Sequence, residues 1–208
     1  MNNNPSIARQ IVEYASQLFD VAGSSQLSSA ENLLITGLES MPERDLDEFG
    51  RINGIIQMYG FKKHAKSKLE ALLNFIHDKG FAAELVGQYG YPTDGKPNLK
   101  KEVIFAGLGK RGKNTIVLHP RYGHRLRFMA IKTNAPLEPL IYSTMNEEEN
   151  PVCNECSICI DICPVKALEP YLMPDPTICL ANTNIMDKEQ GRLVPCELCL
   201  NMCPAGEK

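Results

Sequence analysis

Cysteine is missing from the first 152 residues of this 208-residue chain, and all eight cysteines fall in the last quarter. No apolar run approaches the roughly 18 residues that a membrane span requires. The polar N-terminus has neither the apolar core of a signal peptide nor a twin-arginine pair. With a formal net charge of only −3, the chain also lacks the basic surplus of a nucleic-acid-binding domain. We therefore expect a cytoplasmic protein that contacts no membrane and is unlikely to bind nucleic acid.

The uneven distribution of cysteine predicts two domains. In a reducing compartment, clustered cysteines bind metal or do redox chemistry more often than they form disulfides. The acidic stretch from Met145 to Pro151 precedes the cysteines and is typical of a linker or an exposed turn. We expect an α/β domain over residues 1–144 and a smaller cysteine-bearing domain over residues 145–208.

Hydrophobic periodicity in the first 144 residues predicts a mixed α/β layer domain. Apolar residues recur at helical spacing over residues 5–19 and 62–79, and Gly23 with the serines after it is expected to end the first helix. Strands are expected over residues 32–38, 81–86, 115–119 and 126–133. Residues 99–106 fit either a helix or a strand, and residues 88–97 form a turn-rich loop.

The cysteines form two related motifs that each end in C-x2-C-x3-C-P. The first is similar at every position to the run that binds clusters in bacterial ferredoxins; its cysteines are Cys153, Cys156, Cys159 and Cys163. In the second, the first cysteine is displaced upstream by an insertion of sixteen residues; its cysteines are Cys179, Cys196, Cys199 and Cys203. The insertion would cover one cluster or face a partner protein.

In the ferredoxin run, three cysteines bind one cluster and the fourth binds the neighbouring cluster. Applied here, this exchange gives cluster one the ligands Cys153, Cys156, Cys159 and Cys203. Cluster two then takes Cys163, Cys179, Cys196 and Cys199. Zinc sites or disulfides would use the same residue type. Neither requires the C-x2-C-x2-C-x3-C-P pattern or its partial repeat, so the motifs favour two [4Fe–4S] clusters.

The displaced cysteine before C-x2-C-x3-C-P resembles the iron–sulfur domain of epoxyqueuosine reductases and reductive dehalogenases. The segment from Ala106 to Pro139 also resembles that family, with its AGLG start, GKNT step, PRYG turn and TNAPLEP end. The helix that begins YGFKKHAKSKL at Tyr59 is similar to an upstream helix of the family. The resemblance implies a nitroreductase-like mixed α/β domain followed by a C-terminal two-cluster ferredoxin-type domain.

The resemblance further implies that a cobalamin lies against the α/β domain and receives single electrons from the clusters. The residues that it places near the corrin are Gly107, Leu108, Gly109, Gly112, Lys113, Asn114, Arg127 and Lys132. The glycines would let the backbone approach the ring closely, or would only form a tight packing turn. The basic residues would meet the cofactor, or would only form a solvated surface.

Asp94 lies near the position of the family's proton-donating aspartate. A carboxyl that acts as a general acid near neutral pH needs a raised pKa, usually through burial. The alternative is that Thr93, Asp94 and Gly95 simply form a turn. The three glycines of residues 107–112 also match G-x-G-x-x-G, but a strand follows them instead of a helix, which argues against nucleotide binding.

Two functions fit these patterns. A compact cobalamin-linked oxidoreductase would hold the corrinoid itself, whereas a two-cluster electron carrier would reduce a separate partner such as a corrinoid protein. The chain begins close to the 32–38 strand and ends five residues after Cys203, so we expect a shortened N-terminal domain and no helical-repeat tail. The family-like segment over residues 106–139 favours the oxidoreductase, because a simple ferredoxin would not need it. A redox protein would donate the electrons, and a homodimer would complete the shortened pocket.

Overall fold

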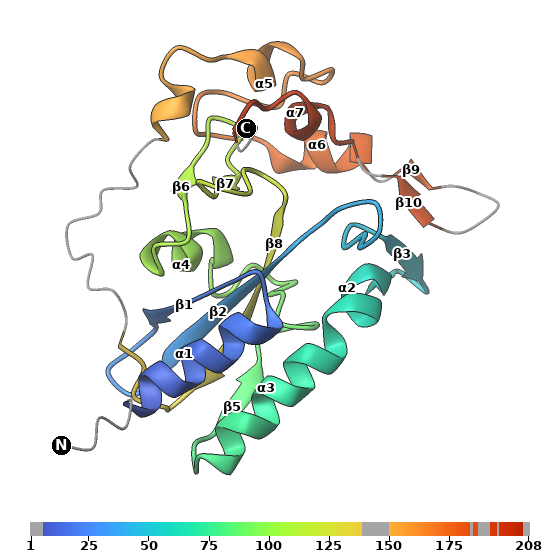
Figure 1. The fold of residues 1–208 in the computed structure, drawn as a ribbon. Coiled ribbons are helices and arrows are strands. Elements are labelled where there is room, and N and C mark those ends of the chain that lie inside the picture. The colour runs from blue at the N-terminus through green and yellow to red at the C-terminus, as the bar shows by residue number, and fades with distance from the viewer. Residues whose placement is uncertain (1–5, 139–149, 184, 187–191, 195, 206–208) are drawn as a thin grey trace. The chain divides into compact units, whose positions relative to one another are not determined.

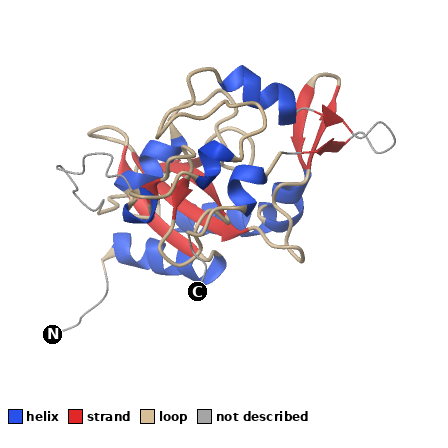
Figure 2. Ribbon diagram, turned by 90° about the horizontal axis from the view of Figure 1, so that it is seen from above, coloured by secondary structure: helices blue, strands red, loops and turns tan. Residues whose placement is uncertain are grey.

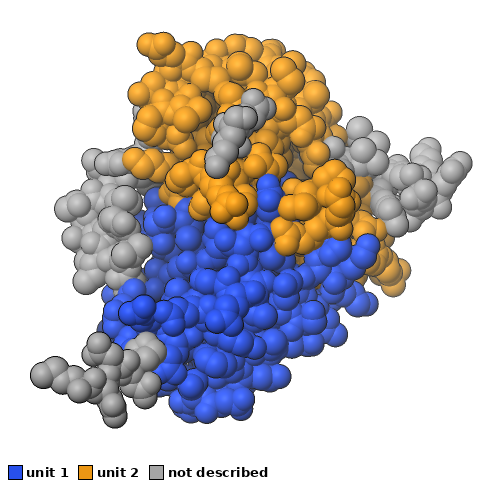
Figure 3. Space-filling view, viewed as in Figure 1, with its two compact units in different colours: residues 1–39, 62–108, 126–145 blue, residues 40–61, 109–125, 146–208 orange. Residues whose placement is uncertain are grey.

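The computed structural model describes residues 6–138, 150–183, 185–186, 192–194 and 196–205. The chain forms two compact units, each assembled from segments that are separated in sequence (Figure 3). Unit 1 comprises residues 1–39, 62–108 and 126–145, and unit 2 comprises residues 40–61, 109–125 and 146–208. The units do not follow a single boundary after residue 144, because residues 40–61 and 109–125 group with the cysteine-bearing segment. The expected acidic linker falls mainly outside the described residues.

Unit 1 is built on a four-stranded antiparallel sheet with the strand order β1-β2-β8-β5 (Figures 1 and 2). The strands are β1 (Val21–Gln26), β2 (Asn32–Glu39), β8 (Leu126–Thr133) and β5 (Ala83–Leu85). The central strands β2 and β8 pair along their whole length, from Asn32 opposite Thr133 to Glu39 opposite Leu126. Residues 33–38 of β2 are all buried, which requires cover on both faces of the sheet.

Three helices provide this cover in unit 1: α1 (Ile7–Leu18), α3 (Lys66–Asp78) and α4 (Leu99–Phe105). Helices α1 and α3 pack against each other, with the rings of Tyr14 and Phe75 stacked at 4.2 Å between centroids. Helix α4 packs against β1, β2 and β8. The short helix α2 (Tyr59–His64) precedes α3, so the expected 62–79 helix is two helices that meet at Ala65. In the segment 99–106, for which the sequence allowed a helix or a strand, residues 99–105 form helix α4.

The expectation that Gly23 and the following serines end the first helix is wrong, because they lie in strand β1. The helix ends earlier, at Leu18, and the small residues become part of the sheet. A Cβ at Gly23 would lie 2.9 Å from the carbonyl oxygen of Ala106, so the strand needs glycine where α4 ends. Ser25 is buried, and its hydroxyl donates to the carboxylate of Glu102 on α4 at 2.8 Å. The contacts of Gly23 and Ser25 with α4 stabilise β1, whose small residues have a low intrinsic tendency to form a strand.

Unit 2 contains a second four-stranded sheet with the order β4-β3-β10-β9. Strands β3 (Phe49–Ile52) and β4 (Ile55–Met58) form a hairpin whose turn, Asn53-Gly54, has the positive φ angles of a type I′ turn. Strands β9 (Ile185–Met186) and β10 (Arg192–Val194) come from the insertion before Cys196. Because β10 pairs with β3, the insertion extends this hairpin into a sheet. The sequence did not predict these four strands.

The remaining elements of unit 2 are short. The hairpin of β6 (Lys110–Arg111) and β7 (Val117–Leu118) replaces the single strand expected over residues 115–119. The cysteine-bearing segment contains the 3-10 helix η1 (Pro151–Cys153) and the helices α5 (Ile158–Asp161), α6 (Pro176–Thr183) and α7 (Leu198–Asn201). In the described part of the chain, no helix is both long and apolar enough to cross a membrane. The mixed α/β class is confirmed, and the nitroreductase-like and ferredoxin-type assignments stay predictions.

Candidate iron–sulfur site

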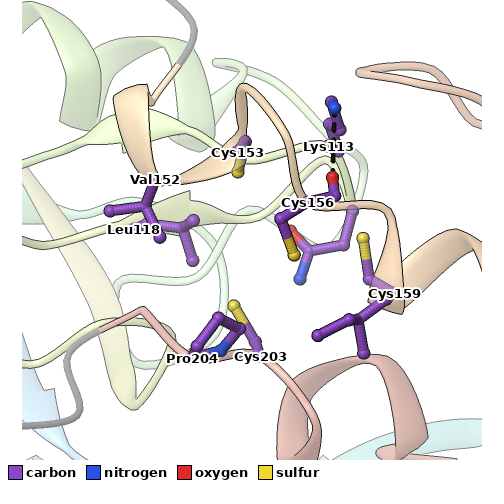
Figure 4. Close-up of a pocket in the computed structure, with 10 residues that line it drawn as sticks. Lys113, Leu118, Val152, Cys153, Cys156, Cys159, Cys203 and Pro204 are labelled. Atoms are coloured by element: carbon purple, nitrogen blue, oxygen red, sulfur yellow. Dashed lines mark hydrogen bonds between the residues drawn. The ribbon is translucent and has the colours of Figure 1, made fainter.

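Four cysteine side chains line one cavity in unit 2, and their sulfur atoms point into it (Figure 4). Cys153, Cys156 and Cys159 come from the first motif, and Cys203 comes from the end of the second. The whole cavity encloses about 300 Å³ of empty space, part of which is open solvent. Its remaining lining residues are Lys113, Asn114, Leu118, Val152, Ile158 and Pro204.

Short helices position these cysteines. Cys153 ends η1, which begins after Asn150, and the Asn150 side chain accepts a hydrogen bond from the Val152 N–H at 3.0 Å. Cys159 lies in α5, and Cys203 follows α7. Helices α5 and α7 contact each other. The two similar C-x2-C-x3-C-P segments are therefore neighbours in space, as an exchange of ligands between them requires.

The electrostatics of Cys159 identify its neighbours. The pKa of its thiol is raised, first by burial and then by the negative charges of Cys203, Cys153 and Cys156. Thiolates repel one another in this way only when they lie close together. These three neighbours are the ones that the ferredoxin-type exchange assigns to the same cluster as Cys159.

The other four cysteines form a second group. Burial raises the pKa of Cys199 from 9.0 to about 11, with further contributions from the charges of Cys179, Cys159, Cys196 and Cys163, in that order. Three of these four are the expected partners of Cys199 in cluster two. Cys163 is buried, and both Cys179 and Cys199 pack against the small apolar cluster to which it belongs.

The cysteine positions bear on the kinds of site that the motifs allow. All eight cysteines are free thiols. Within the described residues, no three Cys, His, Asp or Glu side chains are placed so that they could hold a single metal ion. A zinc ion would need four sulfurs within about 2.3 Å of one centre, whereas in a [4Fe–4S] cubane each thiolate binds a different iron and the sulfurs stay farther apart. The choice of two clusters over zinc sites or disulfides stays a prediction.

The residues that the resemblance places near a corrin fall in both units. Gly107, Leu108, Arg127 and Lys132 belong to unit 1, and Gly109, Gly112, Lys113 and Asn114 belong to unit 2. On strand β8, the Lys132 ammonium pairs with Glu31 at 3.2 Å and with Glu84 at 2.9 Å. The Arg127 guanidinium donates to the carbonyl oxygen of Leu126 at 3.2 Å. Both cations therefore already have partners within unit 1.

Gly109 is needed for packing inside unit 2. A Cβ at Gly109 would lie 2.8 Å from the Leu118 carbonyl oxygen, a backbone atom, and real Cβ atoms do not approach other atoms this closely. A Cβ at Gly112 would lie 2.7 Å from the Leu118 Cδ1, the end of a side chain that can shift. The contact at Gly109 favours the packing alternative at that position.

Lys113 and Asn114 contact the cysteine-bearing segment. The Lys113 ammonium donates to the carbonyl oxygens of Asn154 at 3.2 Å and Cys156 at 3.0 Å (Figure 4). The Asn114 side-chain amide donates to the carbonyl oxygen of Cys199 at 3.4 Å. Sequence reasoning missed these contacts, because no spacing rule links residues 113 and 114 to cysteines that lie more than forty positions away.

Asp94 is exposed, and its Oδ1 accepts a hydrogen bond from the backbone N–H of Lys96 at 3.0 Å. This bond, which spans two residues, is typical of an Asx turn. The expected turn is therefore present, and a role of Asp94 as a proton donor stays a prediction. The Asp94 side chain is not buried in this structure.

Comparisons with known proteins show that this chain is similar in sequence to the epoxyqueuosine reductases. No family model matches the chain. An epoxyqueuosine reductase of Francisella cf. novicida is 29% identical over 157 residues, which cover 69% of this chain and 41% of that protein. The Listeria monocytogenes epoxyqueuosine reductase is 31% identical over 108 residues, which cover 48% of this chain and 27% of that protein. The chain thus spans less than half the length of these relatives.

Solved structures show the same relationship in the fold. Epoxyqueuosine reductase from Streptococcus thermophilus has a TM-score of 0.65 at 17% identity, covering 97% of this chain and 66% of that one. An epoxyqueuosine reductase bound to a modified tRNA stem loop has a TM-score of 0.66 at 18% identity, covering 95% and 64%. A catabolic reductive dehalogenase bound to 3-bromo-4-hydroxybenzoic acid has a TM-score of 0.70 at 15% identity, covering 100% and 33%.

One fold neighbour, at 18% identity, carries a tRNA stem loop, whereas the expectation that nucleic acid is an unlikely partner of this chain stays a prediction. A low net charge is a property of the whole chain and does not exclude a local surface that binds RNA. The chain is a relative of the epoxyqueuosine reductases in sequence, and it shares its fold with them and with the reductive dehalogenases.

Proposed function

We propose that this chain is an iron–sulfur oxidoreductase that passes single electrons through two [4Fe–4S] clusters to a corrinoid that it binds. The observation that carries the proposal is the convergence of Cys153, Cys156 and Cys159 with the distant Cys203 on one cavity. When bound, such clusters supply one-electron chemistry at a potential that depends on charge, hydrogen bonds to sulfur and solvent exposure. The contribution of the chain is to hold the thiolates and to control these three properties.

We assign Cys153, Cys156, Cys159 and Cys203 to the first cluster, and Cys163, Cys179, Cys196 and Cys199 to the second. Burial of Cys153, Cys159, Cys163 and Cys203 limits the access of water to both. In the second group, the backbone N–H of Ala167 donates to the Cys163 sulfur. A hydrogen bond to a ligand sulfur spreads its negative charge and is one means of setting the potential.

The proposal that this chain binds cobalamin rests on proteins that share its fold. One reductive dehalogenase of this fold is described as carrying out B12-dependent dehalogenation, and cobalamin would supply the reductive chemistry here as well. Several residues that the resemblance places near the corrin are engaged within their own units. We therefore assign no contact between a corrin and a particular side chain. Asp94 is the proposed proton donor, and its turn would have to become desolvated when cofactor and substrate bind.

The proposed substrate class also rests on these relatives. Because the curated relatives are epoxyqueuosine reductases, an epoxyqueuosine-bearing tRNA stem loop is the first substrate to test. A small redox protein would donate the electrons, and the chain would act as a homodimer.

Anaerobic reconstitution with iron and sulfide, followed by metal analysis and electron paramagnetic resonance, tests the cluster proposal. We expect about eight irons and eight sulfides per chain, the content of two cubanes. Zinc without sulfide would overturn the proposal. Cobalamin added to the reconstituted protein should elute with it on a sizing column, and its visible spectrum should change when the clusters are reduced. Intact clusters without retained cobalamin would replace the oxidoreductase by an electron carrier that serves a separate partner.

A further inference from the structure

We infer that residues 111–114 act as a clamp on the cysteine-bearing segment, and that the Lys113 ammonium raises the reduction potential of the cluster in the four-cysteine cavity. This inference rests on the proposed function, because it requires a cluster at that place. It gives Lys113 and Asn114 a positioning role that differs from corrin contact.

The backbone of the clamp, residues 111–114, is tied to two points of the cysteine-bearing segment. The carbonyl oxygen of Arg111 accepts a hydrogen bond from the Asn150 N–H at 3.0 Å, just before η1. The carbonyl oxygen of Lys113 accepts from the Tyr171 N–H at 3.1 Å, between the two motifs. These bonds involve no side chain of the clamp, so they persist in side-chain variants and hold position 113 in place.

The Lys113 side chain adds a third point of attachment. Its ammonium donates to two carbonyl oxygens within the C-x2-C loop, those of Asn154 and Cys156. Figure 4 shows the bond to the Cys156 carbonyl beside the cavity into which the Cys156 sulfur points. One cation thus fixes the loop that carries two proposed ligands of the first cluster, and Lys113 is one of the residues that line the cavity.

Asn114 connects this wall to the other cysteine group. It is buried and lines the four-cysteine cavity, and its amide nitrogen donates to the carbonyl oxygen of Cys199. Its Oδ1 accepts from the Ile116 N–H at 3.2 Å, which fixes the orientation of the amide. Two consecutive residues of the clamp therefore hold one proposed ligand of each cluster.

The charge of Lys113 has a defined effect on electron transfer. A cubane bound by four thiolates is an anion, and reduction adds one more negative charge. A nearby cation stabilises the reduced form more than the oxidised form, because the attraction grows with the charge of the cluster. Net charge is one of the established determinants of cluster potential. Removal of the Lys113 charge should therefore lower the potential of the first cluster and leave the second less affected.

Three substitutions separate the charge from the hydrogen bonds. Lys113→Arg keeps both, Lys113→Gln keeps a donor without the charge, and Lys113→Met removes both. The matched control is Lys166→Met, because the Lys166 ammonium also donates to a backbone carbonyl, that of Asp161 at 2.8 Å, but does not line the cavity. The midpoint potential of each cluster in the reconstituted full chain is measured by redox titration followed by electron paramagnetic resonance.

We expect Lys113→Gln and Lys113→Met to reduce the equilibrium constant for reduction of one cluster by about tenfold, which corresponds to ~59 mV for a one-electron couple. Lys113→Arg and Lys166→Met should leave that cluster near the wild-type value. Unchanged potentials in Lys113→Met with full iron content would overturn the inference, and so would equal shifts in the Arg and Met variants. A wild-type protein that assembles no cluster would instead refute the proposed function, so the two failures are distinguishable.

Discussion

The backbone N–H of Ala167 donates a hydrogen bond to the Cys163 sulfur at 3.3 Å, inside a buried cluster. Cys163 belongs to the first motif in sequence, but Cys179 and Cys199 of the second motif pack against its cluster. Cys203 has the reverse relationship, because it ends the second motif and lines the cavity of Cys153. This reciprocal placement gives the ligand exchange a direct test.

Pairs of cysteine substitutions should reveal which ligands share a cluster. In the double variant Cys203→Ala with Cys156→Ala, both losses fall on the first cluster, so we expect about half of the wild-type iron to remain. In Cys203→Ala with Cys199→Ala, each loss falls on a different cluster, and little iron should remain. Iron and sulfide analysis after anaerobic reconstitution measures both.

The opposite pattern would mean that each motif binds its own cluster in chain order. Then Cys203→Ala with Cys199→Ala would keep one cluster and Cys203→Ala with Cys156→Ala would keep none. The two double variants share one substitution, so a general loss of stability caused by Cys203→Ala affects both and does not imitate either pattern.

The protein prepared without iron should lose stability as the pH rises from about 9 to about 11. The pKa of Cys199 in the folded chain is about 11, above its ordinary value of 9.0. In this window the folded state keeps a proton that the unfolded chain has released, so the free energy of unfolding falls with pH, by an amount on the order of 2 kcal/mol. Below pH 9 the contribution is fully present. Urea denaturation under reducing conditions at several pH values measures the slope.

The Cys199→Ala variant is the control for this pH dependence. It removes the titrating thiol, so its free energy of unfolding should fall less over the same window. Part of the slope should persist, because burial also raises the pKa of Cys159. An identical slope in wild type and variant would show that Cys199 does not titrate in this range.

Gly109→Ala should destabilise the chain whether or not cobalamin is present. The new Cβ would lie 2.8 Å from the Leu118 carbonyl oxygen and 2.7 Å from the Val117 Cγ1, and a backbone atom cannot move aside. We expect the free energy of unfolding to fall by more than about 2 kcal/mol. The matched control is Gly95→Ala, because Gly95 also has a positive φ but no atom within 4 Å of its would-be Cβ. A cost no greater than that of the control would contradict the packing role.

Asp94→Asn should separate catalysis from turn formation. An asparagine Oδ1 can accept the same hydrogen bond from the Lys96 N–H, so the Asx turn and the stability should be retained. If Asp94 donates a proton, reductase activity should fall by about 100-fold or more, in the range of general acid catalysis. Activity on a stem-loop substrate and thermal unfolding are measured on the same preparation. Wild-type activity in the variant would reduce Asp94 to a turn residue.

Much of unit 1 could be predicted from periodicity. The helix at residues 7–18 and the strands at residues 32–39 and 126–133 occur close to their expected positions, because the helix buries an apolar stripe and the strands carry largely apolar, buried residues. Strand β1 could not be predicted, since its small residues depend on contacts with α4. The β3–β4 hairpin carries an Asn-Gly turn signal, but its pairing with β10 joins segments that are far apart in the chain.

For the site, the sequence by itself determined which thiols can act together, because C-x2-C-x2-C places sulfurs within reach of one another in any loop of that length. It also indicated the exchange of Cys163 and Cys203 through similarity to the ferredoxin run. Only the tertiary structure decided that Lys113 and Asn114 hold the cysteine-bearing segment and that Gly109 packs against Leu118. The physical reason is separation along the chain. Residue spacing determines contacts within a few residues, whereas contacts between residues forty to eighty positions apart depend on how the chain folds into its packed units.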